Sequence, residues 1–401
     1  MTVYHRLSVW IFGDDGEILA DPTTQSLLIA SSVLITGVML VSPLIADLAT
    51  VYQVSATDAG LLIVGFTAAI AVTLPVVGAL ADRIGRKTMM VSGLLLFGSA
   101  GTAIGFVTQF EVAVGLRAIQ GIGFAATMPV ILTLFGDMYD GSAETTAQGM
   151  RVAGNSVVST LTPVLSGVLF VYSWRYPFVI YALAIPTAMW LWKTIPEVDI
   201  DADESVRAYV DNVTSFLTDG PIALLMVSFG FRFFIYYVFL TYISVLATEE
   251  AGLAVVAVGI LLALNGVVKT VGSTQAGRLS LTFSPEFLAA GSFALMTVGI
   301  TLMGAFPTPA VVALGVFVFG VGDSLLAPTQ KSLVNRMSPA SVRGGANASA
   351  LVFQNIGKVT GPLVFAASLP FLGLAPSFAI VGGVGGAVGA GALFGVWVAA
   401  R

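Results

Sequence analysis

The sequence predicts an all-α integral membrane protein with about twelve transmembrane helices, arranged as two pseudo-symmetric bundles of six. Three observations predict this fold: an apolar composition, apolar runs long enough to span a membrane, and an internal repeat. Of the 401 residues, 57% are hydrophobic and only 10% are charged, whereas soluble domains carry about 25% charged residues. An aqueous globule could not bury so much apolar surface, so the lipid bilayer must solvate most of the chain.

The composition also excludes several classes of function. The chain has no cysteine and a single histidine, His5, so we expect no disulfide, no thiolate chemistry, no metal site and no other cofactor. It has no basic face for nucleic acid and no G-x-x-x-x-G-K-[ST] motif for nucleotide hydrolysis. No paired nucleophile and base is visible. We therefore do not expect an enzyme.

Apolar runs divide the chain. A run of about 20 apolar residues can cross a bilayer as a helix. Such runs recur in two sets of six, at 26–48, 58–80, 89–108, 112–136, 147–170 and 174–195, and at 221–247, 253–276, 286–305, 310–334, 345–368 and 372–399. The expected domains are a tail (1–25), a first bundle (26–195), an acidic linker (196–219) and a second bundle (220–401).

The distribution of basic residues predicts the topology. Lys and Arg are in excess on the loops that follow the second and tenth predicted helices, and such loops face the cytoplasm; these residues are Arg83, Arg86, Lys87, Arg336 and Arg343. Both termini and the acidic linker are then cytoplasmic. We expect a monomeric, multi-pass protein of the plasma membrane, in contact with the lipid bilayer.

The second half of the sequence repeats the first at a constant offset of 199 residues. The matched pairs are Gly60 and Gly259, Gly78 and Gly277, Leu80 and Leu279, Gly121 and Gly320, Gly123 and Gly322, Pro129 and Pro328, Pro163 and Pro362, and Pro177 and Pro376. Parallel halves related by an axis along the membrane normal produce such a repeat. Asp82 and Arg83 correspond to Leu281 and Thr282, so the second copy of this loop loses its charge.

One segment carries a family resemblance. Gly78-Ala-Leu-Ala-Asp82-Arg83-Ile-Gly85-Arg86-Lys87 forms a predicted short loop between the second and third helices. It resembles the G-x-L-a-D-R-x-G-R-K signature of the major facilitator superfamily. The resemblance implies two six-helix bundles and alternating access. It also implies that Asp82 lies near the N-terminus of helix 11, around Gly344–Asn347, where the helix dipole favours a carboxylate.

This resemblance predicts a conformational latch that closes the cytoplasmic side in one state and parts in the other. Its members would be Gly78, Asp82, Arg83, Gly85, Arg86 and Lys87. The alternative is that these charges only fix the topology.

Helix 4 carries Leu116-Arg117-Ala-Ile-Gln120-Gly121-Ile-Gly123, which is similar to the R-x-x-q-G-x-g signature of proton-coupled members of that superfamily. The similarity implies that Arg117 and Gln120 bind substrate or proton. A guanidinium inside the membrane should face a wet cavity or a partner. Alternatively, Arg117 extends to the outer interface.

Further polar residues lie within the other predicted helices. Such groups usually point inward, and the candidates for binding substrate or proton are Asn155, Arg232, Tyr236, Asn265, Lys269, Asp323, Gln354 and Lys358. Asn265 and Lys269, and likewise Gln354 and Lys358, are four residues apart and share a helix face. Asp323 is the carboxylate predicted nearest mid-membrane. It either carries a proton or forms a structural pair with an Arg or Lys.

Charge arithmetic bears on the substrate. If Arg117, Arg232, Lys269, Lys358 and Asp323 all face the cavity, its formal charge is +3, which favours an anionic, zwitterionic or neutral small molecule over a lipophilic cation. We predict a secondary active transporter, coupled to protons, that exports a drug-like compound or metabolite. One alternative is a uniporter or proton symporter of an organic anion. A more distant alternative is a non-transporting membrane sensor.

Overall fold

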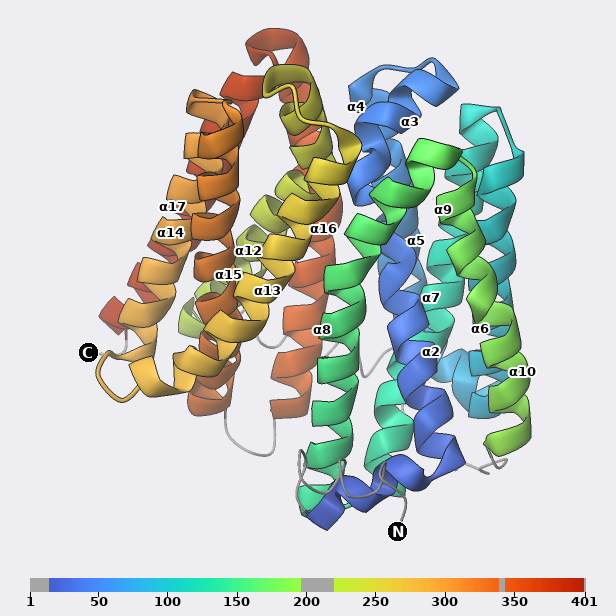
Figure 1. Cartoon of the computed structure of the whole chain (residues 1–401). Coiled ribbons are helices and arrows are strands. Elements are labelled where there is room, and N and C mark those ends of the chain that lie inside the picture. Colours follow the sequence, from blue (N-terminus) through green and yellow to red (C-terminus); the bar gives the residue numbers. More distant parts are fainter. Residues whose placement is uncertain (1–13, 196–219, 339–342, 400–401) are drawn as a thin grey trace.

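The computed structural model of the chain describes residues 14–195, 220–338 and 343–399, which fold into helices without a strand (Figure 1). The predicted all-α membrane fold is confirmed. The first 13 residues and the acidic linker lie outside the described residues. The predicted domain boundaries at both ends of that linker therefore stay predictions.

The first half begins with a short 3-10 helix, Asp14–Ala20. The helices that follow are α2 (Pro22–Met39), α3 (Ile45–Tyr52), α4 (Ala56–Ala59), α5 (Leu61–Ile84), α6 (Arg86–Ala103), α7 (Phe110–Met138), α8 (Gly141–Tyr172), α9 (Tyr176–Val179) and α10 (Ala184–Thr194). The second half contains α12 (Gly220–Val245), α13 (Val255–Leu279), α14 (Pro285–Ala305), α15 (Pro309–Met337), α16 (Arg343–Leu372) and α17 (Leu374–Ala399). In Figure 1, α3 and α4 mark the upper side of the molecule and the start of the described chain marks the lower side.

Local sequence explains several helix starts. Asp21 precedes α2, and its carboxylate accepts hydrogen bonds from the backbone N–H groups of Thr23 (3.2 Å) and Thr24 (3.0 Å). Ser284 caps α14 in the same way, and each helix has proline in its first position. Side-chain caps of this kind satisfy N–H groups that lack a partner inside the helix, and proline there has no N–H to satisfy.

Eleven of the described helices are long and apolar enough to cross a membrane. The sixth predicted helix (174–195) is divided instead: α9 and α10 are joined by a 3-10 turn, Ile180–Leu183, within a continuous helical path. If α9 and α10 are counted together as one further membrane helix, the described residues give the predicted number of about twelve. The first predicted helix is likewise interrupted, by a 3-10 turn at Ser42–Leu44 that contains Pro43.

The predicted loop at residues 78–87 is wrong in length. Helix α5 continues to Ile84 and α6 begins at Arg86, so the connection is Gly85 alone, with φ of 87°. Glycine tolerates this left-handed conformation, which side chains disfavour. Apolar composition predicted where the hydrocarbon ends, but a helix can continue into the polar interface.

The internal repeat is visible in the helices. Both ends of α7 and α15 are offset by 199 residues, because α7 spans Phe110–Met138 and α15 spans Pro309–Met337. The starts of α6 and α14, Arg86 and Pro285, have the same offset.

The packing repeats as well. A Cβ atom placed on Gly123 would lie 2.5 Å from the carbonyl oxygen of Gly93, and one on Gly322 would lie 2.5 Å from that of Ser292. Glycine is therefore required where α7 crosses α6 and where α15 crosses α14, because only a residue without Cβ lets the backbones approach so closely.

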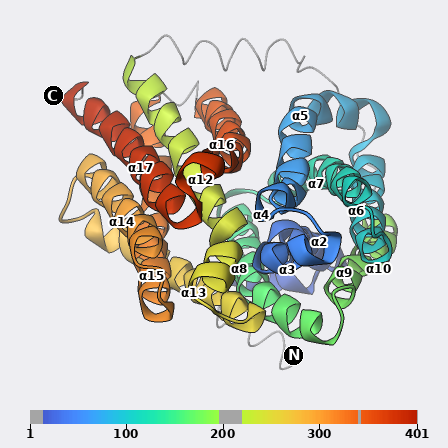
Figure 2. The same ribbon diagram turned by 90° about the horizontal axis from the view of Figure 1, so that it is seen from above.

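The two bundles meet at their upper ends and diverge below. Helix α8 packs along α13, and α5 packs against α16. Near the upper side, Ser42 Oγ donates a hydrogen bond to the backbone oxygen of Leu240 across this seam. A Cβ on Gly259 of α13 would lie 2.5 Å from the oxygen of Pro163 in α8. Figure 1 shows α13 running away from α8 towards the lower side, and Figure 2 shows the two bundles side by side from above.

Candidate functional site: a charged cavity between the bundles

A cavity of about 380 Å³ lies between the two bundles. The first half contributes residues of α2, α5, α7 and α8, and the second half contributes residues of α12, α13, α15 and α16. Towards the upper side α13 is buried at Val258, whereas Thr270 and Ser273 are exposed lower down the same helix. The cavity is thus closed above and accessible from below.

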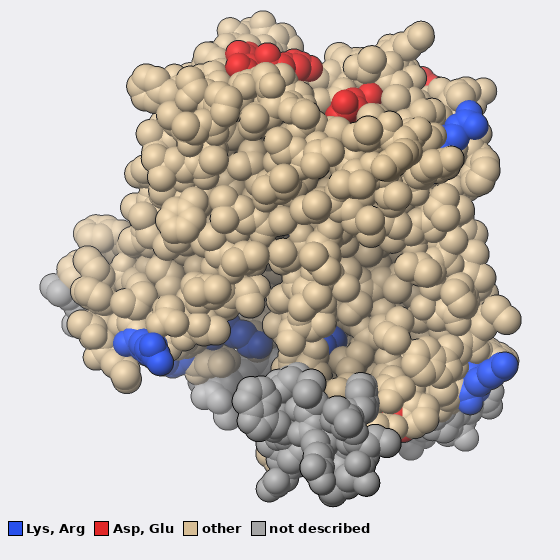
Figure 3. Space-filling view, viewed as in Figure 1, with Lys and Arg blue, Asp and Glu red and all other residues tan. Residues whose placement is uncertain are grey.

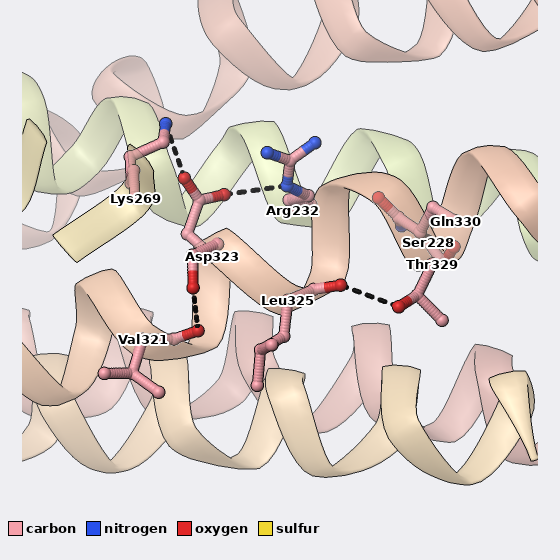
Figure 4. Close-up of polar contacts among 9 residues, drawn as sticks. Ser228, Arg232, Lys269, Val321, Asp323, Leu325, Thr329 and Gln330 are labelled. Atoms are coloured by element: carbon pink, nitrogen blue, oxygen red, sulfur yellow. Dashed lines mark hydrogen bonds and ion pairs between the residues drawn. The ribbon is translucent and has the colours of Figure 1, made fainter. Parts of the chain in front are cut away.

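Three charged side chains form an ion cluster on the wall of the second half (Figure 4). Asp323 of α15 is fully buried. Its Oδ1 lies 2.7 Å from Arg232 Nε of α12, and its Oδ2 lies 2.6 Å from Lys269 Nζ of α13. Lys269 Nζ also lies 4.2 Å from the centre of the Tyr236 ring. One carboxylate therefore joins three helices, and the cluster keeps one net positive charge.

Lys358 of α16 is a second lysine on the cavity wall. Its Nζ lies 3.1 Å from Asn355 Oδ1. The ring centres of Phe233 and Tyr237 lie 5.2 and 5.9 Å from the same nitrogen. Among the described side chains, none of the ion pairs involves Lys358. This ammonium group therefore differs from that of Lys269, which has Asp323 as its counter-charge.

The opposite wall is polar on α8 and mainly apolar on α5 and α7. Asn155 Nδ2 donates to Ser31 Oγ at 2.9 Å, which fixes the amide at the cavity surface. Phe66 and Phe124 supply aromatic surface, with ring centres 5.7 Å apart.

The structure places Arg117 away from the cavity. Its guanidinium is fully buried within the first bundle, where it donates to the backbone oxygens of Leu62 (2.7 Å) and Gly37 (2.8 Å) and to Gln120 Oε1 (2.5 Å). It also lies over the Phe66 ring, 4.5 Å from its centre. Neither Arg117 nor Gln120 is among the residues that line the cavity. The predicted cavity charge of +3 is therefore too high by at least the charge of Arg117.

We expect Arg117→Lys to destabilise the protein. A lysine presents one compact ammonium group in place of the planar guanidinium group, so it cannot reach the backbone oxygens of both Leu62 and Gly37. Losing one hydrogen bond from a charged group costs about 1.5–3 kcal/mol, and we expect a fall of that size in the free energy of unfolding. Thermal unfolding in detergent measures it, with exposed Arg278→Lys as the matched control. Unchanged stability combined with lost transport would contradict this role and favour ligand binding by Arg117.

The other predicted site residues divide into two groups. Asn155, Tyr236, Asn265, Lys269, Asp323 and Lys358 line the cavity together. Arg232 reaches it only through Asp323, and Gln354 is not among the lining residues. Sequence reasoning missed Asn355, the neighbour of Gln354. The three-residue spacing between Asn355 and Lys358 was the signal that could have identified it.

The predicted latch is only partly described. Gly78, Asp82 and Arg83 belong to α5, but the surroundings of these residues lie outside what the structure describes, as do those of Gly344 and Gly345 in α16. Contact between Asp82 and helix 11 thus stays a prediction. Lys87 Nζ lies 4.8 Å from the centre of the Trp192 ring.

Arg86 at the start of α6 forms an ion pair with Asp137 near the end of α7. At the equivalent junction of the second half, Arg336 Nη2 lies 3.2 Å from Glu286 Oε1. Asp137 and Arg336 are 199 residues apart, and Glu286 corresponds to Lys87, the neighbour of Arg86. The second half therefore keeps an ion pair near this place, with the two charges exchanged between the helices.

Surface charge is unevenly distributed. In Figure 3, Lys and Arg occur mainly along the lower part of the molecule, whereas Asp and Glu gather at its upper edge. Lys193, Arg278 and Arg336 lie in the last turns of α10, α13 and α15. Within the described residues, no group of three His, Asp or Glu side chains could hold a metal ion.

A helical membrane protein with two repeat-related bundles and a charged cavity between them has the architecture of a secondary transporter. Sequence comparison agrees: the Major Facilitator Superfamily profile matches residues 27–362 and 242–401. The chain belongs to this superfamily.

Curated relatives are similar at low identity. The chain is 26% identical to the chloramphenicol resistance protein of Streptomyces lividans over 341 residues, covering 83% of this chain and 86% of that protein. It is 24% identical to the 3-(3-hydroxy-phenyl)propionate transporter of Escherichia coli (strain K12) over 315 residues, covering 75% of each. The match to the bacillibactin exporter of Bacillus subtilis (strain 168), at 26% identity, covers 36% of this chain and only 38% of that protein.

Solved structures share the fold. A bacterial homologue of the human lysosomal transporter Spinster, in an inward-facing and unoccupied conformation, superposes with a TM-score of 0.76 at 15% identity and 94% coverage of both chains. The D-xylose–proton symporter gives the same TM-score and identity, covering 94% of this chain and 97% of its own.

Proposed function

We propose that this transporter is coupled to protons and exports a drug-like compound or metabolite by alternating access. The ion cluster of Asp323, Arg232 and Lys269 on the cavity wall is the observation that carries the proposal. Protonation of this carboxylate would weaken both ion pairs at once and free charged groups on three helices, which would link proton binding to helix movement. The same contacts would also occur in a purely structural pair, so the experiment must separate the two roles.

The proposed orientation places the lower side in the cytoplasm and the protein in the plasma membrane. The basic last turns of α10, α13 and α15 support this, because loops rich in Lys and Arg stay in the cytoplasm. The cavity then opens to the cytoplasm, the side from which an exporter loads. The relatives named as a bacillibactin exporter and a chloramphenicol resistance protein support export. We further propose a monomer with no enzymatic activity.

Uniport or proton symport of an organic anion is the second candidate. Lys358, which makes no ion pair among the described side chains, favours it. The relative named as a 3-(3-hydroxy-phenyl)propionate transporter offers one such anion for testing.

Transport by the purified protein in vesicles tests this proposal. The panel contains neutral chloramphenicol, anionic 3-(3-hydroxyphenyl)propionate and the cation ethidium, each measured with and without an imposed pH gradient. Antiport predicts substrate movement opposite to the proton flow and its loss with a protonophore. Movement with the protons would indicate symport, and transport indifferent to the gradient would indicate uniport. Either result would contradict the proposed coupling.

A further inference from the structure

The cavity holds more positive than negative charge. The described charged groups on its second-half side are the lining residues Lys269, Lys358 and Asp323, together with Arg232, which is paired with Asp323. Asp323 compensates one cation, and its two ion pairs occupy both carboxylate oxygens. These four residues therefore have a formal charge of +2. Lys358 differs from the other two cations because its hydrogen-bond partner is an amide oxygen, not a carboxylate. An uncompensated charge at this depth is costly, so an anion placed there would be stabilised.

The surroundings of Lys358 restrict the shape of that anion. Phe233 and Tyr237 flank the ammonium group, and Asn355 lies one turn away on the same helix face. A carboxylate could accept hydrogen bonds from Lys358 and from the amide of Asn355. Across the cavity, Phe66 and Phe124 supply an apolar aromatic wall, with the two rings packed edge to face.

A further lysine lies on α15 beyond the cavity-lining residues. Asp323, Ser324 and Ala327 of α15 line the cavity, and Lys331 follows Ala327 by four residues on the same helix face. Lys331 is exposed and lines a separate depression with Asn335.

We propose that the cavity binds a small aromatic monoanion, whose carboxylate pairs with Lys358 and Asn355 and whose ring packs against Phe66 and Phe124. This inference rests on the proposed transport function and specifies its substrate class. A cavity of about 380 Å³ is within the size range of small-molecule sites. Asp323 stays paired with Arg232 and Lys269, so substrate charge and coupling charge are held by different residues.

Equilibrium binding of 2-naphthoate to the purified full-length protein tests the proposal. Its amide, 2-naphthamide, has the same ring without the charge. Because a charge-assisted hydrogen bond contributes about 1.5–3 kcal/mol, wild-type protein should bind naphthoate at least about tenfold more tightly than naphthamide. Lys358→Gln should remove this preference by weakening naphthoate alone, whereas Lys358→Arg should retain most of it. Lys193→Gln, at the end of α10, is the matched control and should bind like wild type.

Several results would overturn the inference. These are equal affinity of the wild type for the two compounds, no binding of either, or unchanged naphthoate affinity in Lys358→Gln. Naphthamide binding by Lys358→Gln at wild-type strength verifies that the variant is folded; a loss of both ligands together would also contradict the assigned role. Naphthoate binding without any transport would instead contradict the proposed function and leave this inference standing.

Discussion

Asp323→Asn should abolish pH-driven transport and destabilise the protein. The substitution removes the counter-charge of both Arg232 and Lys269, which lie 2.7 and 2.6 Å from the carboxylate. Breaking a buried ion pair by removing one partner costs about 3–5 kcal/mol. We expect a decrease of that size in the free energy of unfolding, measured in detergent, and loss of gradient-driven transport of whichever panel compound is moved by the wild type.

The double variant Asp323→Asn/Lys269→Gln separates coupling from structure. It returns the cluster to the net charge of the wild type, because one cation is removed together with the carboxylate. Stability should recover substantially, whereas proton-driven transport should stay lost if Asp323 carries the proton. Recovery of gradient-driven transport in the double variant would show that Asp323 is a structural partner only.

Gly259→Val should open the upper seam. A Cβ at this position would lie 2.5 Å from the oxygen of Pro163, so α13 could not approach α8 as closely as it does. The expected result is a shift towards the conformation open at the upper side, with little change in the packing inside each bundle. Overpacking of this kind costs about 1–3 kcal/mol, which is enough to shift an equilibrium between conformations about five- to 150-fold.

The natural absence of cysteine makes this shift simple to measure. Leu240→Cys places a thiol at a position with 1% exposure, while its backbone oxygen still accepts from Ser42. An impermeant maleimide added from the upper side should label this thiol slowly in the parent and at least about fivefold faster in the Gly259→Val background. Gly277→Val in the same helix is the control, because no atom lies within 4 Å of its added Cβ. Equal labelling of parent and Gly259→Val would contradict the closure described at the seam.

Much of the fold followed from the sequence for a physical reason. Lipid forces each spanning segment to be apolar and helical, so composition and length predict the elements directly. The 199-residue repeat then related α7 to α15 and α6 to α14. The Gly85 connection was mispredicted because apolar runs mark the membrane and do not mark where a helix ends.

The site was less predictable, because polar spacing does not determine how a helix is rotated against its neighbours. Arg117 has the depth of a cavity residue but faces the backbone oxygens of Leu62 and Gly37. Asp323 was predicted to lie near mid-membrane, but its contacts to Lys269 and Arg232 depend on how three helices pack. Asn355, rather than Gln354, contacts Lys358, a difference of one residue and about 100° around the helix.

The central claim is alternating access between the two bundles. It is tested most directly by measuring distances between spin labels at the two ends of α8 and α13. One pair, Tyr172→Cys with Ala254→Cys, spans the seam at the upper side. The other, Thr145→Cys with Thr274→Cys, spans the lower opening. A change of pH or addition of substrate should lengthen the upper distance and shorten the lower one in the same population. Two distances that stay constant, or that lengthen together, would contradict it.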